Sequence, residues 1–304
     1  MKSVVVLIPC YNEENTITSV VNSFKEYLPC ATIYVYDNGS TDDTVKVAKE
    51  AGAIVVSVQN RGKGNVVRKM FADINADIFV MVDGDSTYTA ADAPRMVDLL
   101  ISANVDMVVA VRNAKSENAY RSWHKIGNKF FNFILKVLFN STYRDIFSGY
   151  RVFSRRFVKT FPVASGGFDI EAELSIHSLT LSIPFAEIES AYLERPANSN
   201  SKLQTFRDGF RILCSILRLL KETKPLLFFG AISLIAFILA LIFVYPIIVA
   251  FFETGLVPRL PTVVLSSGLM MISFLSLTCG MILDSVSQAR LEMKKLHYLM
   301  LTMD

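Results

Sequence analysis

The stretch Ile78-Phe79-Val80-Met81-Val82-Asp83-Gly84-Asp85 decides the fold class of this chain. Its five apolar residues, followed at once by two carboxylates, predict a buried β-strand that ends in an acidic turn. Comparable apolar runs predict further strands at residues 4–8, 32–36, 54–58 and 107–111, and helical patterns separate them near 14–28, 41–51, 64–75 and 90–103. Apolar strands that alternate with helices are typical of a parallel sheet covered on both faces. The sequence therefore predicts an α/β fold with a mostly parallel sheet.

Polar residues cluster where each predicted strand ends. The clusters lie at residues 9–14, 37–42, 60–65, 83–88 and 112–113. Ligands of open parallel sheets bind beyond the carboxyl ends of the strands, so we expect these clusters to form one site. A turn or a helix N-cap would explain part of any single cluster. For example, Ser40 or Thr41 would also cap the next helix. Several clusters at successive strand ends favour a binding site.

Asp83 and Asp85 are the candidate metal ligands of this site. Two carboxylates one residue apart can hold a divalent cation that keeps positions for phosphate oxygens and water. An acidic surface turn is the alternative interpretation of this pair taken alone.

Motifs of other enzyme classes are missing from the sequence, because GxSxG, HExxH, GxxxxGK[ST] and GxGxxG do not occur at the expected places, and the three histidines lack ligand spacing.

The composition divides the chain into a polar part and an apolar part. Residues 225–252 and 260–283 carry no formal charge, and each run exceeds the ~20 residues needed to cross a hydrocarbon core. The predicted divisions are a catalytic domain at 1–203, an amphipathic interface helix at 204–224, a two-helix membrane hairpin at 225–283 and an amphipathic tail at 284–304. Basic residues flank the hairpin on both sides, which places the catalytic domain and the tail in the cytoplasm, at the cytoplasmic (inner) membrane. The net charge of +3, with no basic stripe, argues against a nucleic-acid partner.

Six strings of this sequence resemble the family 2 glycosyltransferases of the GT-A fold. They are residues 9–14 (PCYNEE), 37–42 (DNGSTD), 61–65 (RGKGN), 83–85 (DGD), 145–151 (DIFSGYR) and 168–173 (FDIEAE). The set resembles in particular the dolichol-phosphate mannose synthases and the bacterial polyprenyl-phosphate glycosyltransferases, among them the bactoprenol glucosyltransferases. With the two-span hairpin included, the resemblance covers nearly the whole chain.

The resemblance implies a role for each matching residue. The nucleotide sugar is expected to contact Pro9, Tyr11, Asn12, Glu13, Asp37, Asp83, Asp85, Arg195 and Lys202. The acceptor phosphate is expected to bind Arg112, Arg121 and Lys125, and the catalytic set is Asp83, Asp85 and Arg112. Mg²⁺ or Mn²⁺ is expected on Asp85, with Thr87 as a weak additional ligand. Asp145 is expected to pair with Arg151; alternatively, Asp145 and Glu171 orient the cations or the sugar hydroxyls.

These expectations combine into an inverting glycosyltransferase. It would move a sugar, with glucose as the first guess, from a UDP-sugar to polyprenyl (undecaprenyl) phosphate at the cytoplasmic face of the membrane. A second copy of the chain is also an expected partner, because the family relatives imply a tetramer. One alternative is a processive polysaccharide enzyme of the same fold, although Trp123 is the sole tryptophan and no QxxRW motif is present. The other alternative is a membrane scaffold with a degenerate transferase domain.

Overall fold

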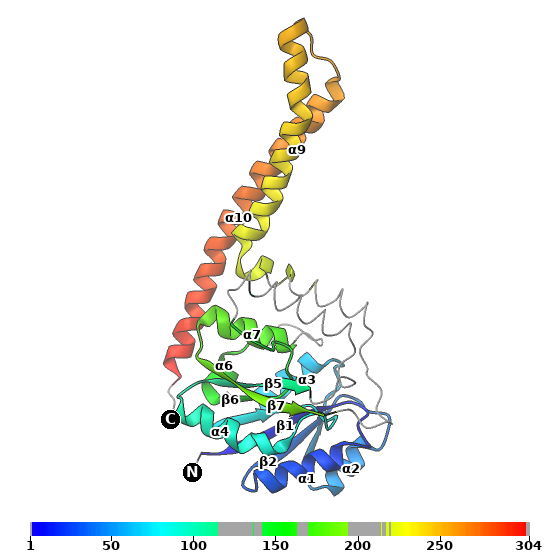
Figure 1. Ribbon diagram of the computed structural model, residues 1–304, viewed down its shortest axis with the longest axis vertical. Helices are drawn as coiled ribbons and strands as arrows, with labels where there is room; N and C mark the ends of the chain where they lie inside the picture. The colour runs from blue at the N-terminus through cyan, green and yellow to red at the C-terminus, as the bar shows by residue number, and fades with distance from the viewer. Residues whose placement is uncertain are drawn as a thin grey trace. The chain divides into compact units, whose positions relative to one another are not determined.

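The computed structural model describes residues 2–114, 142–162, 170–193 and 220–301, together with positions 136, 214, 217 and 218. Its centre is a seven-stranded sheet in the order β3-β2-β1-β4-β6-β5-β7 (Figure 1). The strands are β1 (Val4–Cys10), β2 (Thr32–Asp37), β3 (Ile54–Ser57), β4 (Ile78–Met81), β5 (Met107–Ala114), β6 (Arg151–Ser154) and β7 (Phe185–Tyr192). Of these strands, β6 runs antiparallel to both of its neighbours, β4 and β5. The carboxyl ends of the other six strands therefore meet at one edge of the sheet.

Helices cover both faces of this sheet. One face carries α1 (Ile17–Tyr27), α2 (Thr44–Glu50), the 3₁₀ turn η1 (Ala90–Asp92) and α4 (Ala93–Ser102), and the other carries α3 (Lys63–Asp73), α6 (Arg155–Thr160) and α7 (Ile170–Leu181). Side chains alternate between the two faces of each strand, so β1 contributes residues to the hydrophobic core on each face of the sheet. Val6 and Ile8 join the cluster under α1 and α4. On the opposite face, the ring of Phe71 contacts those of Phe79 and Phe153.

The predicted α/β fold with a mostly parallel sheet is confirmed. All five predicted strands are present, and their observed ends differ by up to three residues. The strands β6 and β7 were not predicted from the sequence. The first is only four residues long and begins with Arg151, which is fully buried. The second is an edge strand whose glutamates, Glu187 and Glu189, interrupt its apolar pattern.

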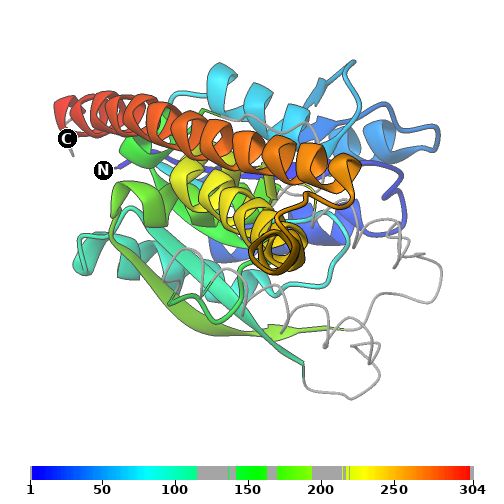
Figure 2. The same cartoon turned by 90° about the horizontal axis from the view of Figure 1, so that it is seen from above.

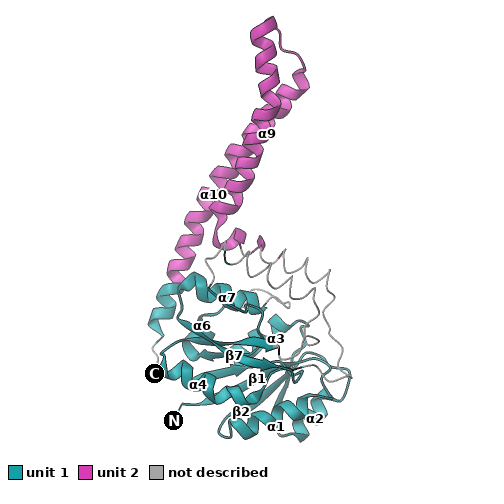
Figure 3. Cartoon of the chain, viewed as in Figure 1, with its two compact units in different colours: residues 1–212, 294–304 teal, residues 213–293 magenta. Residues whose placement is uncertain are grey.

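The chain divides into two compact units, residues 1–212 with 294–304 and residues 213–293 (Figure 3). The second unit contains α9 (Pro225–Thr254) and most of α10 (Leu260–Met300), and both helices are long and apolar enough to cross a membrane. They lie side by side (Figures 1 and 2), where the hydroxyls of Ser233 and Ser273 are 3.0 Å apart and Gly280 packs against Phe229. The sequence predicted separate helices before and after residue 283, whereas α10 continues without a break to Met300.

Candidate active site

The polar loops at the carboxyl ends of β1, β2 and β3 are hydrogen-bonded to one another. The amide N–H of Asn12 donates to Oγ of Ser40 at 2.9 Å, and Oδ1 of Asn12 accepts from the N–H of Thr41 at 2.8 Å. Asn38 makes the next link, because its Nδ2 donates to the carbonyl of Asn60 at 2.8 Å. Asn12 was predicted to contact the nucleotide. In the structure its side chain joins two loops, and its backbone has a φ of 51°.

Three other predicted nucleotide residues lie at the same edge. The guanidinium of Arg61 lies 5.6 Å from the ring centroid of Tyr11, within the range of a cation–π contact. Pro9 lies in β1, opposite Tyr36 of β2, and the amide of Glu13 donates to Oγ1 of Thr44.

Asp37 ends β2 and is buried. Its carboxylate accepts from the amides of Gly39 and Ser40, which forms a tight turn with Gly39 at a φ of 78°. Asp37 therefore fixes the shape of the turn that follows β2.

Lys63 lies between two carboxylates at the same edge of the sheet. Its Nζ lies 2.5 Å from Oδ1 of Asp83 and also contacts Oε1 of Glu171. Burial opposes the charge of this ammonium, but the two carboxylates outweigh burial and raise the pKa of Lys63. Lys63 begins α3 and Glu171 lies in the first turn of α7, so the cluster joins three separate elements. It holds one positive and two negative charges.

Asp85 lies deeper than Asp83. Its side chain is buried, and Oδ1 accepts from the hydroxyl of Thr87 at 2.6 Å and from the backbone N–H of Thr87 at 3.2 Å. Between them Ser86 adopts a φ of 59°, which fits the tight acidic turn that the sequence predicted. Thr87, predicted as a weak metal ligand, therefore orients Asp85 directly.

Arg112 lies at the end of β5 and is held by Asp145. Its Nε and Nη2 donate to the two carboxylate oxygens at 2.6 and 2.8 Å, and its Cζ lies 5.6 Å from the ring centroid of Tyr192. Burial favours protonation of Asp145, but the hydrogen bonds and charge of Arg112 prevail and lower the pKa of the Asp145 carboxyl. Such a bidentate pair fixes the plane of the guanidinium.

The expected pairing of Asp145 with Arg151 is wrong. Arg151 is fully buried, and its guanidinium donates to the carbonyls of Ile146 and Ser148 and to Oγ of Ser175. It holds the shape of the 146–148 loop from within the core. The alternative that Asp145 orients a cation of the site agrees with its contact to Arg112.

The loop after β4 is joined to the end of β7. The amide of Leu193 donates to the carbonyl of Thr87 at 2.8 Å, and Tyr88 forms an antiparallel bridge with Tyr192. Because Tyr192 also lies under Arg112, this bridge connects the acidic turn to the guanidinium.

Four predicted site residues lie outside the described residues: Arg121, Lys125, Arg195 and Lys202. Conversely, the structure brings in residues to which the sequence assigned no role or only an alternative one, namely Lys63, Gly149, Glu171 and Tyr192. Lys63, Gly149 and Glu171 belong to motifs quoted above, RGKGN, DIFSGYR and FDIEAE, so their motifs were the available signal.

The carboxylates of this edge fit a hard divalent cation. Among the described residues, no group of three or more His, Cys, Asp and Glu side chains is arranged around one metal position. Mg²⁺ in nucleotide enzymes is commonly bound by one or two carboxylates together with substrate phosphates and water. Asp83 and Asp85 supply this kind of donor set.

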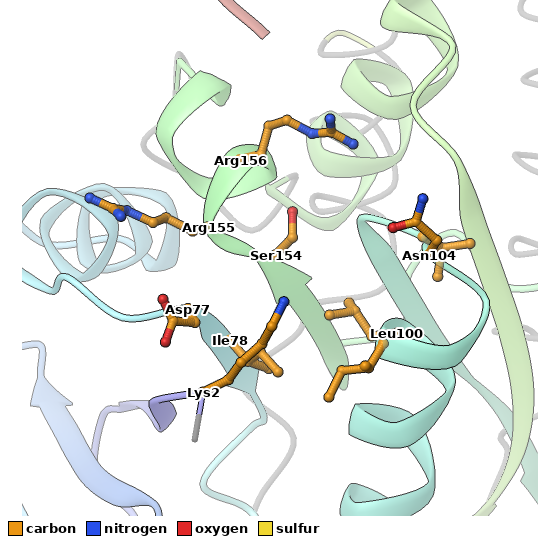
Figure 4. A pocket seen from close by; sticks show the side chains of 10 residues that line it. Lys2, Asp77, Ile78, Leu100, Asn104, Ser154, Arg155 and Arg156 are labelled. Atoms are coloured by element: carbon orange, nitrogen blue, oxygen red, sulfur yellow. The ribbon is translucent and has the colours of Figure 1, made fainter. Parts of the chain in front are cut away.

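A cavity of about 90 Å³ lies away from this site (Figure 4). Its lining includes Ile78, the first residue of β4, and Ser154, the last residue of β6. Because β6 is antiparallel to β4, these residues mark the edge opposite to the acidic turn. The cavity is therefore separate from the candidate active site.

Comparisons with known proteins show the family of the chain. The sequence model of glycosyl transferase family 2 matches residues 5–161, more than half of the chain. The chain belongs to this family. It is 35% identical over 233 residues to glycosyltransferase AglJ of Haloferax volcanii, with 76% of each chain covered. It is 27% identical over 219 residues to the dolichyl-phosphate hexose transferase of the same organism, covering 72% of this chain and 94% of the relative.

Solved structures support the glycosyltransferase fold. One is the Mycobacterium tuberculosis glucosyl-3-phosphoglycerate synthase in complex with Mn²⁺, uridine diphosphate and glucosyl-3-phosphoglycerate. The TM-score is 0.60 at 24% identity, over 71% of this chain and 79% of that chain. The family and the fold make this chain a glycosyltransferase with a GT-A-like catalytic domain and two apolar C-terminal helices.

Proposed function

We propose that this glycosyltransferase moves a hexose from a UDP-sugar to a polyprenyl phosphate such as undecaprenyl phosphate, with inversion at the anomeric carbon. The observation that carries the proposal is the fixed guanidinium of Arg112 at the same sheet edge as Asp83 and Asp85. An anion site beside a carboxylate pair suits a reaction between a phosphate and a metal-bound diphosphate. Two apolar helices in the same chain and a relative named as a dolichyl-phosphate hexose transferase support a lipid acceptor.

The donor would bind along the loops after β1, β2 and β4. In this proposal Tyr11 offers a ring to the base, Asp37 shapes the adjoining turn, and Asp85 with Asp83 faces the diphosphate. A divalent cation bound there would stabilise the charge of the departing diphosphate. Lys63 and Glu171 hold Asp83 in place, so the two carboxylates keep a fixed spacing.

The acceptor phosphate would be held by Arg112. A phosphate monoester has a second pKa near ~6, so the acceptor is mostly a dianion at neutral pH and needs no strong general base. An acceptor oxygen forms the new bond to the anomeric carbon, while the bond from that carbon to the diphosphate breaks and its electron pair leaves with the nucleotide. Because Asp145 fixes the plane of Arg112, the phosphate is oriented before the reaction. Arg121 and Lys125 remain proposed partners of Arg112.

Glucose is the first sugar to test, and the membrane is the proposed location. We propose that α9 and α10 cross the cytoplasmic membrane as a hairpin and that the catalytic unit lies in the cytoplasm. Basic residues before α9 and late in α10 support this orientation.

The experiment uses the full chain, purified in detergent, with radiolabelled UDP-glucose, Mg²⁺ or Mn²⁺ and a short polyprenyl phosphate. A product with one sugar per lipid is expected, and removing the metal with EDTA should stop its formation. Asp85→Asn should lower the rate by about 100-fold or more, because several kcal/mol of charge stabilisation are lost. Asp98→Asn, at an exposed carboxylate of α4, is the matched control and should keep the rate.

Other outcomes discriminate among the alternatives. A lipid product with another UDP- or GDP-sugar would change the sugar and keep the reaction class. Products with many sugars would favour a processive enzyme. Absence of both transfer and donor hydrolysis with every nucleotide sugar would favour a scaffold and refute the proposal.

A further inference from the structure

The last turns of α10 belong to the catalytic unit. Residues 294–304 group with residues 1–212, although α10 begins within the second unit. Within the catalytic unit, the hydroxyl of Tyr298 donates to Oδ2 of Asp106, a residue 192 positions earlier in the chain. The ring of Tyr298 also lies against Arg156, whose Cζ is 4.2 Å from the ring centroid. Tyr298 therefore makes one charge-assisted hydrogen bond and one cation–π contact.

The surface that receives Tyr298 is built on a buried, hydrogen-bonded carboxylate. Asp106 is completely buried, and its carboxylate also accepts from Oγ of Ser154 at 2.5 Å and from Nη2 of Arg156 at 2.6 Å. Its backbone is fixed as well, since its N–H donates to the carbonyl of Pro184 and its carbonyl accepts from Ser154. Asp106, Ser154 and Arg156 thus join the segment before β5 to the end of β6 and the start of α6. We call this the Asp106 cluster.

The cluster lies beside the nearby cavity and shares part of its lining. Arg156 and Ser154 line that cavity, yet Figure 4 shows the Arg156 side chain extended away from Asp77 and Lys2. The guanidinium instead meets Asp106 and the ring of Tyr298. The carboxylate of Asp106 accepts a hydroxyl proton, and the guanidinium of Arg156 suits an aromatic ring. Tyr298 supplies both groups.

The contact gives the catalytic unit a second connection to the apolar helices. The chain leaves the catalytic unit after residue 212, forms α9 and most of α10, and returns to it at residue 294. Without the Tyr298 contact, residues 294–304 would be held by fewer interactions. The catalytic unit would then depend more on its connection to the apolar helices at residue 212. Two connections restrict the orientations of a tethered domain more than one connection does.

We propose that Tyr298 is a latch, which holds the end of α10 on the Asp106 cluster and thereby restricts how the catalytic unit is presented to a lipid bilayer. The latch matters for an acceptor embedded in the bilayer and not for one dissolved in water. This function of the latch rests on the proposed lipid acceptor, whereas the docking of Tyr298 does not.

The test compares two acceptors and two substitutions. Tyr298→Ala removes the ring and the hydroxyl, and Tyr298→Phe removes the hydroxyl alone. Leu299→Ala, at an exposed neighbouring position of α10, is the matched control. Each variant is assayed with a long polyprenyl phosphate in phospholipid vesicles and with a short, water-soluble prenyl phosphate.

We expect Tyr298→Ala to lower transfer to the bilayer acceptor about tenfold, the size of one charge-assisted hydrogen bond. Transfer to the soluble acceptor should change less than about twofold, within the scatter of single-contact effects. Tyr298→Phe should fall between Tyr298→Ala and the wild type, and Leu299→Ala should match the wild type. Equal losses with both acceptors would show a merely structural role and overturn the proposal, as would equal activity of all variants.

A separate measurement reports on docking alone. Trypsin cleaves after lysine, and Lys294 and Lys295 adjoin the latch. The C-terminal fragment, followed by mass spectrometry, should be released about tenfold faster from Tyr298→Ala than from the wild type or Leu299→Ala. Unchanged release would refute the docking. If the wild type makes no lipid product but the release rates differ as expected, the proposed function fails while the docking stands.

Discussion

The backbone of Gly149 packs directly against the carboxylate of Asp83. A Cβ atom on Gly149 would lie 2.8 Å from Cγ of Asp83, a distance that real side chains do not adopt. The amide N–H of Gly149 also donates to the hydroxyl of Tyr88, at 3.0 Å. Asp83 is thus confined between the Lys63 ammonium and a loop that cannot retreat freely.

Gly149→Ala should displace Asp83 and lower the rate of sugar transfer. We expect a loss of about tenfold or more, with a cost of about 1–3 kcal/mol in stability from overpacking. Transfer rates and thermal unfolding of the purified variant measure both effects. Gly268→Ala is the control, because nothing lies within 4 Å of a Cβ at that helical position. A Gly149→Ala variant with normal transfer would show that Asp83 tolerates displacement.

Lys63→Met should destabilise the catalytic unit, because two carboxylates lose the cation that they share. Asp83 and Glu171 would then face each other without the cation that neutralises them. Removing one partner of a buried ionic cluster typically costs about 3–5 kcal/mol. The double variant Lys63→Met/Glu171→Gln should recover part of this loss, because one of the two negative charges is gone. Thermal unfolding of both variants measures this difference, and a double variant as unstable as Lys63→Met would contradict the repulsion.

The edge of the sheet at which the site lies was predictable from the sequence. The apolar run at 78–82 and its neighbours define parallel strands, and parallel strands bring their carboxyl ends together. The contact between Lys63 and Glu171 was not predictable from local patterns, because 108 residues separate them and β6 and β7 were missed. Only the packing of α7 shows which carboxylate Lys63 meets.

The partner of Asp145 was mispredicted for a related reason. Arg151 is six residues away in sequence and Arg112 is thirty-three, so proximity along the chain favoured the wrong arginine. In the structure, Arg151 begins a core strand, where backbone carbonyls satisfy its guanidinium. Arg112 ends β5 at the open edge, where Asp145 reaches it.

The pair of Arg112 and Asp145 should make the free energy of unfolding decrease as the pH becomes acidic. The pKa of Asp145 is lower in the folded protein than its ordinary value of about 3.9. Its contribution is therefore fully present above that value and is lost as the pH falls through the folded pKa. Asp145→Asn should lower the free energy of unfolding by on the order of 3 kcal/mol at neutral pH. The difference in this free energy between the variant and the wild type, the stability gap, should narrow below about pH 4.

Thermal unfolding between pH 3 and 7, measured for both proteins, gives this gap directly. Glu26→Gln, at an exposed carboxylate of α1, is the control and should show no gap at any pH. A gap for Asp145→Asn that stays constant down to pH 3 would mean that the charge of Asp145 is unimportant.

The last prediction concerns the hairpin formed by α9 and α10. At ~1.5 Å per residue, the 30 residues of α9 extend about 45 Å, which exceeds the ~30 Å hydrocarbon core of a bilayer. Thr254 ends α9, and Gly255, with a φ of 67°, begins the short link to α10. Lys221 and Lys224 precede α9, while the basic residues of α10 lie at the other end of that helix, at Arg290, Lys294 and Lys295.

Because basic flanks stay in the cytoplasm, only the link should reach the outside. The test labels single cysteines placed at Ser199, Thr254 or Thr302, in a chain whose four native cysteines are replaced by serine. In intact cells, an impermeant thiol reagent should react at position 254 alone, and permeabilisation should expose the other two positions. Labelling of position 199 or 302 from outside would refute the hairpin. It would also refute the proposal that donor and lipid meet at the cytoplasmic face, since the catalytic unit would then face away from the nucleotide sugar.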